Sequence, residues 1–269
     1  MGIDVGGTKT LVAALNDGGE ILEHDKFPTP KDYDDFLKQL DQVLSHFMHH
    51  DFQAGGAGLP GRLNRDKGLI VRLGNLPWLN EPIQKDLEAV CRCPIVIEND
   101  AKMGGLSEAM LLKDRYQKVL YVAIGTGIGV ALINKGVIDT NIADGGGHSL
   151  TLEHRGKFMP WEEFAAGRAI AERYGKPAHD ISDEKTWRAI SRYLAQGLIH
   201  YMAVTDPEVI VLGGSVGSYF DRYGAILKEE LQKYNLPLIT LPELVGAQRP
   251  EEAVVYGCYD LAKQVYGRA

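Results

Sequence analysis

Three glycine-rich turns, each following a run of apolar residues, constrain the fold of this chain most strongly. They are Gly6-Gly7-Thr8, Gly125-Thr126-Gly127 and Gly213-Gly214-Ser215. Glycine lets backbone N–H groups come close to an anion, and the hydroxyl side chains add further donors. A single turn of this kind is common and indicates no more than a tight hairpin. Three of them after apolar strands predict an α/β protein that binds a phosphate-bearing ligand.

The runs around the first two turns predict two similar strand-turn-strand units, over Ile3–Leu15 and Val119–Ile133. This weak internal repeat predicts two related domains, with the glycine turns lining a nucleotide cleft. Apolar spacing and turn residues predict the other elements. They are helices over residues 32–47, 100–112, 187–204 and 251–265, and short buried strands over Ile95–Ile97 and Val209–Leu212.

Composition excludes several classes of protein. The 269 residues, 45% of them hydrophobic and 24% charged, are typical of a soluble globular protein with one large domain or two ordinary ones. A net charge of -7 with scattered Lys and Arg gives no basic surface for nucleic acid. We expect no membrane span and no signal peptide. Three cysteines are too few for a disulfide framework, so we expect a cytoplasmic protein.

The first glycine turn and two carboxylates suggest a phosphoryl-transfer site. Asp4, just before the turn, is placed to hold Mg²⁺ through water, because hard cations prefer carboxylate and water oxygens. Asp100 ends a buried strand, where a carboxylate could accept a proton from an attacking hydroxyl. An ordinary helix N-cap is the alternative role for Asp100, and the two roles are compatible. The predicted phosphate-binding loop consists of Gly6, Gly7, Thr8, Lys9 and Thr10.

A longer series of motifs runs from Met1 to about residue 260. It consists of Asp4-Val5-Gly6-Gly7-Thr8-Lys9, Gly58-Leu59-Pro60-Gly61, Asn75-Leu76-Pro77-Trp78, Glu98-Asn99-Asp100-Ala101, Gly125-Thr126-Gly127-Ile128-Gly129, Gly147-His148, Glu162, Ala166-Gly167-Arg168-Ala169 and Leu212-Gly213-Gly214. In this order the motifs resemble the ROK family of bacterial sugar kinases and repressors. The resemblance implies an actin-like ATPase (ribonuclease H-like) fold of two domains, ATP with Mg²⁺ as phosphoryl donor, and a hexose or amino-hexose acceptor.

The resemblance also implies roles for individual residues. Asp100 looks like the general base that deprotonates the sugar 6-hydroxyl, and Asn99 like a ligand of a sugar hydroxyl. The expected domains are 1–102, completed by a C-terminal helix over 251–269, and 103–250. The family suggests a homodimer. Further implied sugar contacts are Gly61, Asn75, His148 and Glu162; implied nucleotide contacts are Gly125, Thr126 and Gly127, with Gly213 and Gly214 on the adenosine side.

One departure from the family pattern concerns zinc. Many members carry a cysteine cluster that binds structural zinc together with the histidine equivalent to His148, but here Lys157–Trp161 contains no cysteine. We therefore expect no structural zinc, and we expect Phe158, Met159 and Trp161 to fill the space with apolar contacts. His148 then faces the sugar or is an ordinary packed histidine. The zinc-free pattern also resembles the polyphosphate glucokinases of the same family.

The second departure is Gly145, which stands where the family has a sugar-binding glutamate. Losing a charged hydrogen bond to a sugar costs about 1.5–3 kcal/mol, so altered specificity is expected rather than an inactive enzyme. Asp144 is an alternative carboxylate, shifted by one residue. A repressor would need a DNA-binding segment before Asp4, which lies close to the first residue, so we do not expect one. A sugar sensor without turnover remains the other alternative, and the sequence leaves open the sugar and the choice between ATP and polyphosphate.

Overall fold

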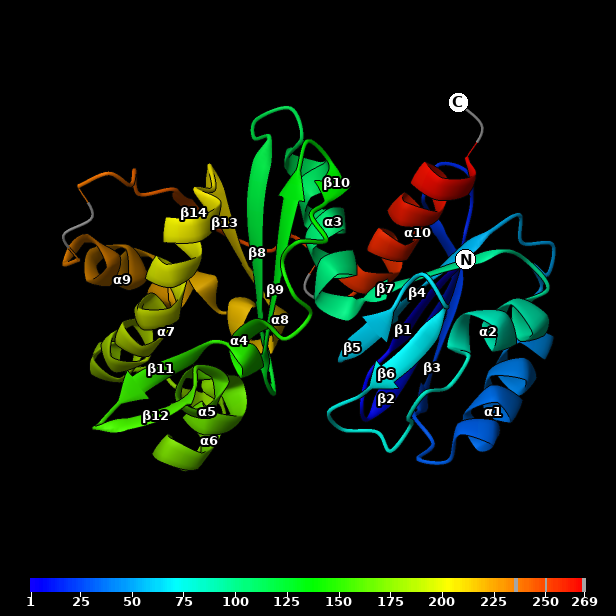
Figure 1. Ribbon diagram of the computed structural model, residues 1–269, viewed down its shortest axis with the longest axis horizontal. Coiled ribbons are helices and arrows are strands. Elements are labelled where there is room, and N and C mark those ends of the chain that lie inside the picture. The colour runs from blue at the N-terminus through cyan, green and yellow to red at the C-terminus, as the bar shows by residue number, and fades with distance from the viewer. Residues whose placement is uncertain (235–236, 250, 268–269) are drawn as a thin grey trace. The chain divides into compact units, whose positions relative to one another are not determined.

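The computed structural model describes residues 1–234, 237–249 and 251–267, and it divides into two compact units (Figure 1). Unit 1 comprises Met1–Ser107 and Glu252–Ala269, and unit 2 comprises Glu108–Glu251. The expected domain boundaries were 102/103 and 250/251. Residue 250 and residues 268–269, on which part of that expectation falls, lie outside the described residues. Each unit contains its own five-stranded sheet.

Unit 1 is built on a mixed sheet with the strand order β3-β2-β1-β4-β7. The first three strands are antiparallel neighbours, as the turns in the sequence predicted, whereas β4 and β7 run parallel to β1. A separate hairpin of β5 and β6 follows β4. The strands are β1 (Gly2–Val5), β2 (Lys9–Leu15), β3 (Ile21–Pro28), β4 (Gly55–Leu59), β5 (Arg62–Asn64), β6 (Leu69–Arg72) and β7 (Ile95–Asn99).

Helices cover both faces of this sheet, with α1 and α2 together on one side (Figure 1). α1 begins after Asp32, whose carboxylate caps it, and buries an apolar stripe that includes Phe36. α10 packs against β1 and β4 so closely that a Cβ on Gly2 would lie 2.7 Å from the Val255 carbonyl oxygen. The helices are α1 (Tyr33–Ser45), α2 (Ile83–Cys91), α3 (Asp100–Leu112), which continues into unit 2, and α10 (Ala253–Tyr266).

Unit 2 repeats the arrangement of the first sheet. Its strand order is β10-β9-β8-β13-β14, with three antiparallel strands followed by two parallel ones. The similarity of order and direction explains the weak internal repeat in the sequence. The strands are β8 (Lys118–Ile124), β9 (Ile128–Asn134), β10 (Val137–Ile138), β13 (Val209–Gly213) and β14 (Glu243–Gly246).

The helices of unit 2 pack around a large apolar core. α7 and α9 pack on each other and on the sheet (Figure 1). No helix in the described ranges is both long and apolar enough to cross a membrane. The helices are α4 (Gly146–Ser149), α5 (Glu162–Ala165), α6 (Gly167–Tyr174), a 3₁₀ turn (Ala178–Asp180), α7 (Glu184–Thr205), α8 (Gly214–Gly217) and α9 (Phe220–Gln232).

The segment that lacks the cysteines forms a hairpin of β11 (Thr151–His154) and β12 (Lys157–Pro160). Its turn has positive φ angles at Arg155 and Gly156, as a two-residue type I′ turn requires. The apolar filling expected here is only partly correct. Trp161 is fully buried and Met159 packs against the core, but Phe158 is 81% exposed because alternate residues of a strand point to opposite faces.

Candidate active site

Two carboxylates of unit 1 are brought together across the glycine Gly58. Asp4 on β1 pairs in register with Gly58 on β4, and a Cβ on Gly58 would lie 3.5 Å from the Cα of Asp100. Asp100 stands at the start of α3, directly after β7, as the sequence predicted. Because Gly58 has no side chain, Asp4 and Asp100 share one small region at the ends of three parallel strands.

The electrostatics of Asp4 reflect this position. The pKa of Asp4 is raised to about 7, chiefly because the carboxyl is removed from water and also because the charge of Asp100 lies nearby, while the cation of Lys26 opposes the shift. A cation bound here would offset the loss of hydration of Asp4 and the repulsion between the two carboxylates. The pair therefore fits the chemistry of a magnesium site. The described residues contain no cluster of three or more His, Cys, Asp or Glu side chains able to hold a metal. Mg²⁺ bound through water and phosphate oxygens needs only one or two carboxylates.

Asn99 fixes the strand-to-helix junction that carries Asp100. Its Oδ1 accepts hydrogen bonds from the N–H groups of Ala101 (3.1 Å) and Lys102 (3.4 Å), so Asn99 caps α3. Its Nδ2 donates to the carbonyl oxygen of Gly61 at 3.3 Å. Gly61 itself has a φ of +83°, and a Cβ there would lie 2.4 Å from the Arg72 carbonyl oxygen. The predicted sugar-side residues Asn99 and Gly61 are therefore in contact with each other.

A buried ion pair next to this junction was not expected from the sequence. Glu98 is 4% exposed, and its carboxylate receives two hydrogen bonds from the guanidinium of Arg65, one of them from Nε at 2.8 Å. The same carboxylate accepts the Asn99 N–H at 2.6 Å. Arg65 follows β5, so the pair ties the β5–β6 hairpin to the strand that ends at Asp100. The only signal in the sequence was a glutamate following the apolar run Ile95–Ile97.

The predicted phosphate loop of unit 1 is a tight turn in contact with Asn75. The Gly6 N–H donates to the Lys9 carbonyl oxygen at 3.0 Å, and a Cβ on Gly7 would lie 2.7 Å from the Cβ of Asn75. The side chains of Thr8 and Lys9 are exposed, as is that of Asn75. This arrangement leaves the loop and the Asn75 side chain on an accessible surface of the unit.

Thr10 differs from the other loop residues. We expected its hydroxyl to meet phosphate, but the residue is fully buried and its Oγ1 lies 2.9 Å from the Oγ1 of Thr29. Thr29 in turn donates to the Gly6 carbonyl oxygen at 2.8 Å. Strand alternation turns Thr10 inward, so its hydroxyl supports the loop from within the protein.

In unit 2, Glu162 joins the second glycine loop to His148. Its Oε2 accepts a hydrogen bond from the Ile128 N–H at 3.1 Å, and its Oε1 lies 2.9 Å from the Nδ1 of the exposed His148. A Cβ on Gly127 would lie 2.6 Å from that Oε2, so a larger residue at this position would require the Glu162 carboxylate to move. The Thr126 side chain is exposed. Unit 2 therefore holds the predicted sugar contacts Glu162 and His148 directly against the predicted phosphate loop.

The third glycine turn lies beside the second. Gly213 pairs with Ala123 in register, and a Cβ on Gly214 would lie 2.7 Å from the Ile124 carbonyl oxygen. Gly214 has a φ of +73°, a conformation that favours glycine. The parallel pairing of β8 and β13 thus places the turns that begin at Gly125 and Gly213 at the same edge of the sheet.

The structure gives a steric reason for glycine at position 145. A Cβ there would lie 1.7 Å from the Oγ of Ser149 and 2.7 Å from its Cβ. Gly145 precedes α4, and its carbonyl oxygen accepts the N–H groups of His148 and Ser149 at 2.9 and 3.2 Å. A glutamate would have to displace Ser149 from this short helix.

We therefore predict that Gly145→Glu alone lowers sugar affinity and the melting temperature, because the added side chain distorts the helix that carries His148. The double variant Gly145→Glu/Ser149→Gly removes both clashing atoms and should recover the melting temperature. Thermal unfolding measures the melting temperature of each single variant and of the double variant, and sugar titration measures their sugar affinity. A single Gly145→Glu variant as stable as the parent would contradict the steric explanation.

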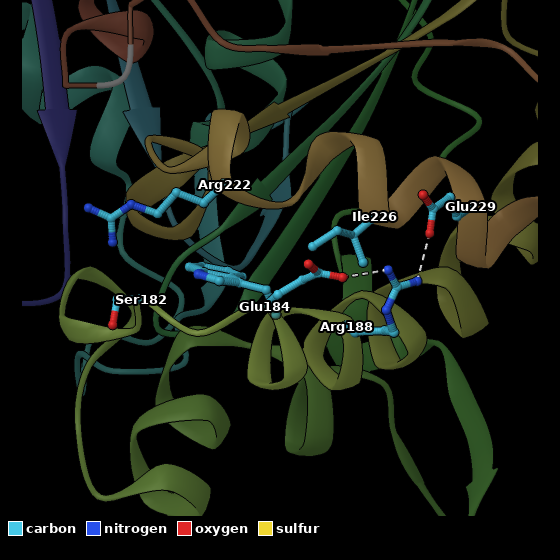
Figure 2. A pocket seen from close by; sticks show the side chains of 7 residues that line it. Ser182, Glu184, Arg188, Arg222, Ile226 and Glu229 are labelled. Carbon is cyan, nitrogen blue, oxygen red and sulfur yellow. Dashed lines mark hydrogen bonds and ion pairs between the residues drawn. The ribbon is translucent and has the colours of Figure 1, made fainter.

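A pocket of unit 2 lies between the start of α7 and one side of α9, apart from the residues described so far (Figure 2). Trp187 and Ile226 form its apolar part. Figure 2 shows Arg188 between the carboxylates of Glu184 and Glu229. Its guanidinium donates to Glu184 at 2.8 Å and to Glu229 at 2.7 Å. The positive charge of Arg188 is thus paired within the protein. No residue predicted for catalysis or binding lines this pocket.

The family model described as the ROK family matches residues 1–265. The N-acetyl-D-glucosamine kinase of Vibrio parahaemolyticus is 28% identical over 296 residues, covering 95% of this chain and 97% of the relative. The ROK hexokinase of Thermus thermophilus superposes with a TM-score of 0.79 at 28% identity, over 98% and 97% of the two chains. The inorganic polyphosphate/ATP-glucomannokinase of Arthrobacter sp. strain KM superposes with a TM-score of 0.73 at 27% identity, over 98% of each chain.

Proposed function

Since the chain belongs to the ROK family and is a sugar kinase with the actin-like ATPase fold, we propose that it transfers the terminal phosphoryl group of ATP to the 6-hydroxyl of a glucose-like hexose. The single observation that carries this proposal is the approach of Asp4 and Asp100 across Gly58. Mg²⁺ bound with phosphate needs one or two carboxylates, and proton transfer needs a carboxylate on a fixed support such as the start of a helix, so the pair supports metal-assisted phosphoryl transfer.

In the proposed reaction the oxygen of the sugar hydroxyl attacks the terminal phosphorus of ATP. Asp100 accepts the proton of that hydroxyl during the attack. The bond from that phosphorus to the bridging oxygen breaks, and ADP leaves with the electron pair. Asn99 and the Glu98–Arg65 pair keep the Asp100 junction in place. Mg²⁺, held through water by Asp4, would neutralise charge on the phosphate oxygens.

The glycine turns and their neighbours account for substrate binding. In unit 1 we assign Gly6, Gly7, Thr8 and Lys9 to the phosphates, because their backbone and side chains form an accessible turn. We assign Asn75 to the sugar. In unit 2 we assign Gly125, Thr126 and Gly127 to the phosphates, Gly213 and Gly214 to the adenosine, and Glu162 and His148 to the sugar. The hydrogen bond between Glu162 and the Ile128 N–H supports this assignment, because it joins the proposed sugar residue to the proposed phosphate loop.

A coupled assay over a panel of hexoses and amino-hexoses tests the proposal. ATP and inorganic polyphosphate are supplied separately as donors, since a relative carries both donors in its name. We expect turnover with ATP and at least one glucose-like sugar, with the phosphate found on the 6-oxygen. Sugar binding by thermal shift without turnover from either donor would instead favour a sugar sensor. Turnover with polyphosphate but not with ATP would identify polyphosphate as the phosphoryl donor.

The raised pKa of Asp4 predicts a pH dependence of stability. Asp4 has a pKa of about 7 in the folded protein and 3.8 as its ordinary value, so its contribution to stability is complete below about pH 3.8 and is lost as the pH rises through 7. Asp4→Asn should therefore be more stable than the parent at pH 8, and the two should converge near pH 4. Thermal unfolding without divalent cations measures this. An equal melting temperature of both proteins at pH 8 would contradict the prediction.

A further inference from the structure

The segment Thr29–Lys31 lies between β3 and α1. Its first and last residues form hydrogen bonds with the phosphate loop of unit 1. The Thr29 N–H donates to the Thr8 carbonyl oxygen at 3.0 Å, and the Thr29 hydroxyl donates to that of Gly6 at 2.8 Å. The Lys31 ammonium donates to the Gly7 carbonyl oxygen at 3.3 Å. Three successive carbonyl groups of the loop thus accept hydrogen bonds from one short segment.

Lys31 also forms a hydrogen bond with the loop that carries Asn75. Its Nζ donates to the Asn75 carbonyl oxygen at 3.0 Å, while its own carbonyl oxygen accepts the Trp78 indole N–H at 2.9 Å. Trp78 is buried in the core of unit 1 and packs against Phe36 with ring centroids 4.7 Å apart. The main chain of Lys31 is therefore held by the core, and its side chain reaches both loops.

The acceptors of the Lys31 ammonium are neutral. Its two partners, Gly7 and Asn75, offer carbonyl oxygens, and Lys31 forms no ion pair with any residue in the described ranges. Hydrogen bonds from a charged donor are stronger than neutral ones, which favours this linkage even at an exposed position. Lys31 differs in this respect from Lys38, which pairs with Asp35 at 2.9 Å.

We propose that Lys31 is a positioning residue that links the sugar loop at Asn75 to the phosphate loop at Gly7, so that binding of one substrate favours binding of the other. The inference rests on the proposed function for the identity of the two ligands, but the linkage itself is a property of unit 1. Two loops that share one ammonium are ordered together, and a ligand that orders one loop reduces the entropy lost when the other binds its ligand. Affinity coupling between two such sites is reciprocal.

Hydrogen exchange of the ligand-free protein tests the linkage directly. Lys31→Met should increase deuterium uptake in peptides covering residues 5–9 and in those covering residues 73–79. Lys38→Met serves as the matched control, because it removes an exposed lysine of the same unit that touches neither loop. Lys31→Arg, which keeps the charge and the donors, should recover most of the protection. Unchanged uptake in Lys31→Met, or increased uptake in only one loop, would overturn the proposal.

Calorimetric titration tests the consequence for binding. We expect the sugar identified in the panel to tighten binding of a non-hydrolysable ATP analogue by about 5-fold in the parent and in Lys38→Met, near the low end of typical coupling because Lys31 is exposed. The ratio should fall close to one in Lys31→Met, whereas a merely structural loss would weaken both ligands and leave the ratio unchanged. A retained ratio overturns the proposal. If the parent phosphorylates no sugar, the proposed function fails, and the exchange experiment still decides the linkage.

Discussion

An Asp100→Asn variant is expected to phosphorylate sugar about 10³-fold more slowly than the parent, within the range of about 10²–10⁴ that general bases contribute. The amide is nearly isosteric with the carboxylate but cannot accept the proton of the attacking hydroxyl. Its oxygen can still receive the Ala101 N–H, which lies 2.8 Å from Asp100 Oδ1, so the start of α3 should be preserved. The loss should therefore appear in kcat, with little change in melting temperature or sugar affinity.

The matched control is Asp183→Asn, which alters the carboxylate that caps α7 by accepting the Thr186 N–H at 2.8 Å. Asparagine caps helices as well as aspartate does, so this variant should retain full activity. A further readout is specific to the carboxylate pair. Because the charge of Asp100 raises the pKa of Asp4, Asp100→Asn should lower that pKa, which NMR titration can follow. An Asp100→Asn variant within threefold of the parent rate would remove Asp100 from the role of base.

Much of the fold could be predicted from the sequence because the decisive signals are local. The Gly6-Gly7 turn between two apolar runs gives β1 and β2, and the spacing of Phe36 and its neighbours gives α1. Asp100 was placed at a strand-to-helix junction for the same reason. Signals of this kind depend on residues within one turn or one strand of each other, so a single sequence contains them.

The parts of the site that depend on strand register could not be predicted. Gly58 belongs to a motif for which the resemblance implied a sugar contact at Gly61, and only the pairing of β1 with β4 shows that Gly58 lies between Asp4 and Asp100. The Arg65–Glu98 pair joins residues 33 positions apart. A hydrogen bond between such distant residues leaves no periodic pattern in the chain. The burial of Thr10 is similar, since its partner Thr29 comes from the neighbouring strand region.

The hairpin that has no zinc-binding cysteines is held by aromatic contacts within unit 2. His154 stacks on Phe164 with ring centroids 4.3 Å apart, and Arg173 lies 4.3 Å from the centroid of Tyr193. Trp161 follows the hairpin directly, is fully buried, and donates its indole N–H to the Tyr193 carbonyl oxygen at 2.9 Å. The stacking of His154 and the indole hydrogen bond of Trp161 fix the hairpin to α5 and α7.

Trp161→Ala is accordingly expected to destabilise unit 2 by about 3–5 kcal/mol, the usual cost of truncating a buried aromatic side chain. Gly197 on α7 accommodates the indole, since a Cβ there would lie 2.1 Å from a ring carbon, so the backbone cannot close on the cavity without moving α7. The control is Phe158→Ala in the same hairpin, which should change stability by less than about 0.5 kcal/mol because the ring is 81% exposed. Urea unfolding followed by fluorescence and by circular dichroism measures both. Equal stability of the two variants would mean that Trp161 does not hold the hairpin, whereas the predicted difference would show that the buried indole anchors this segment to α7.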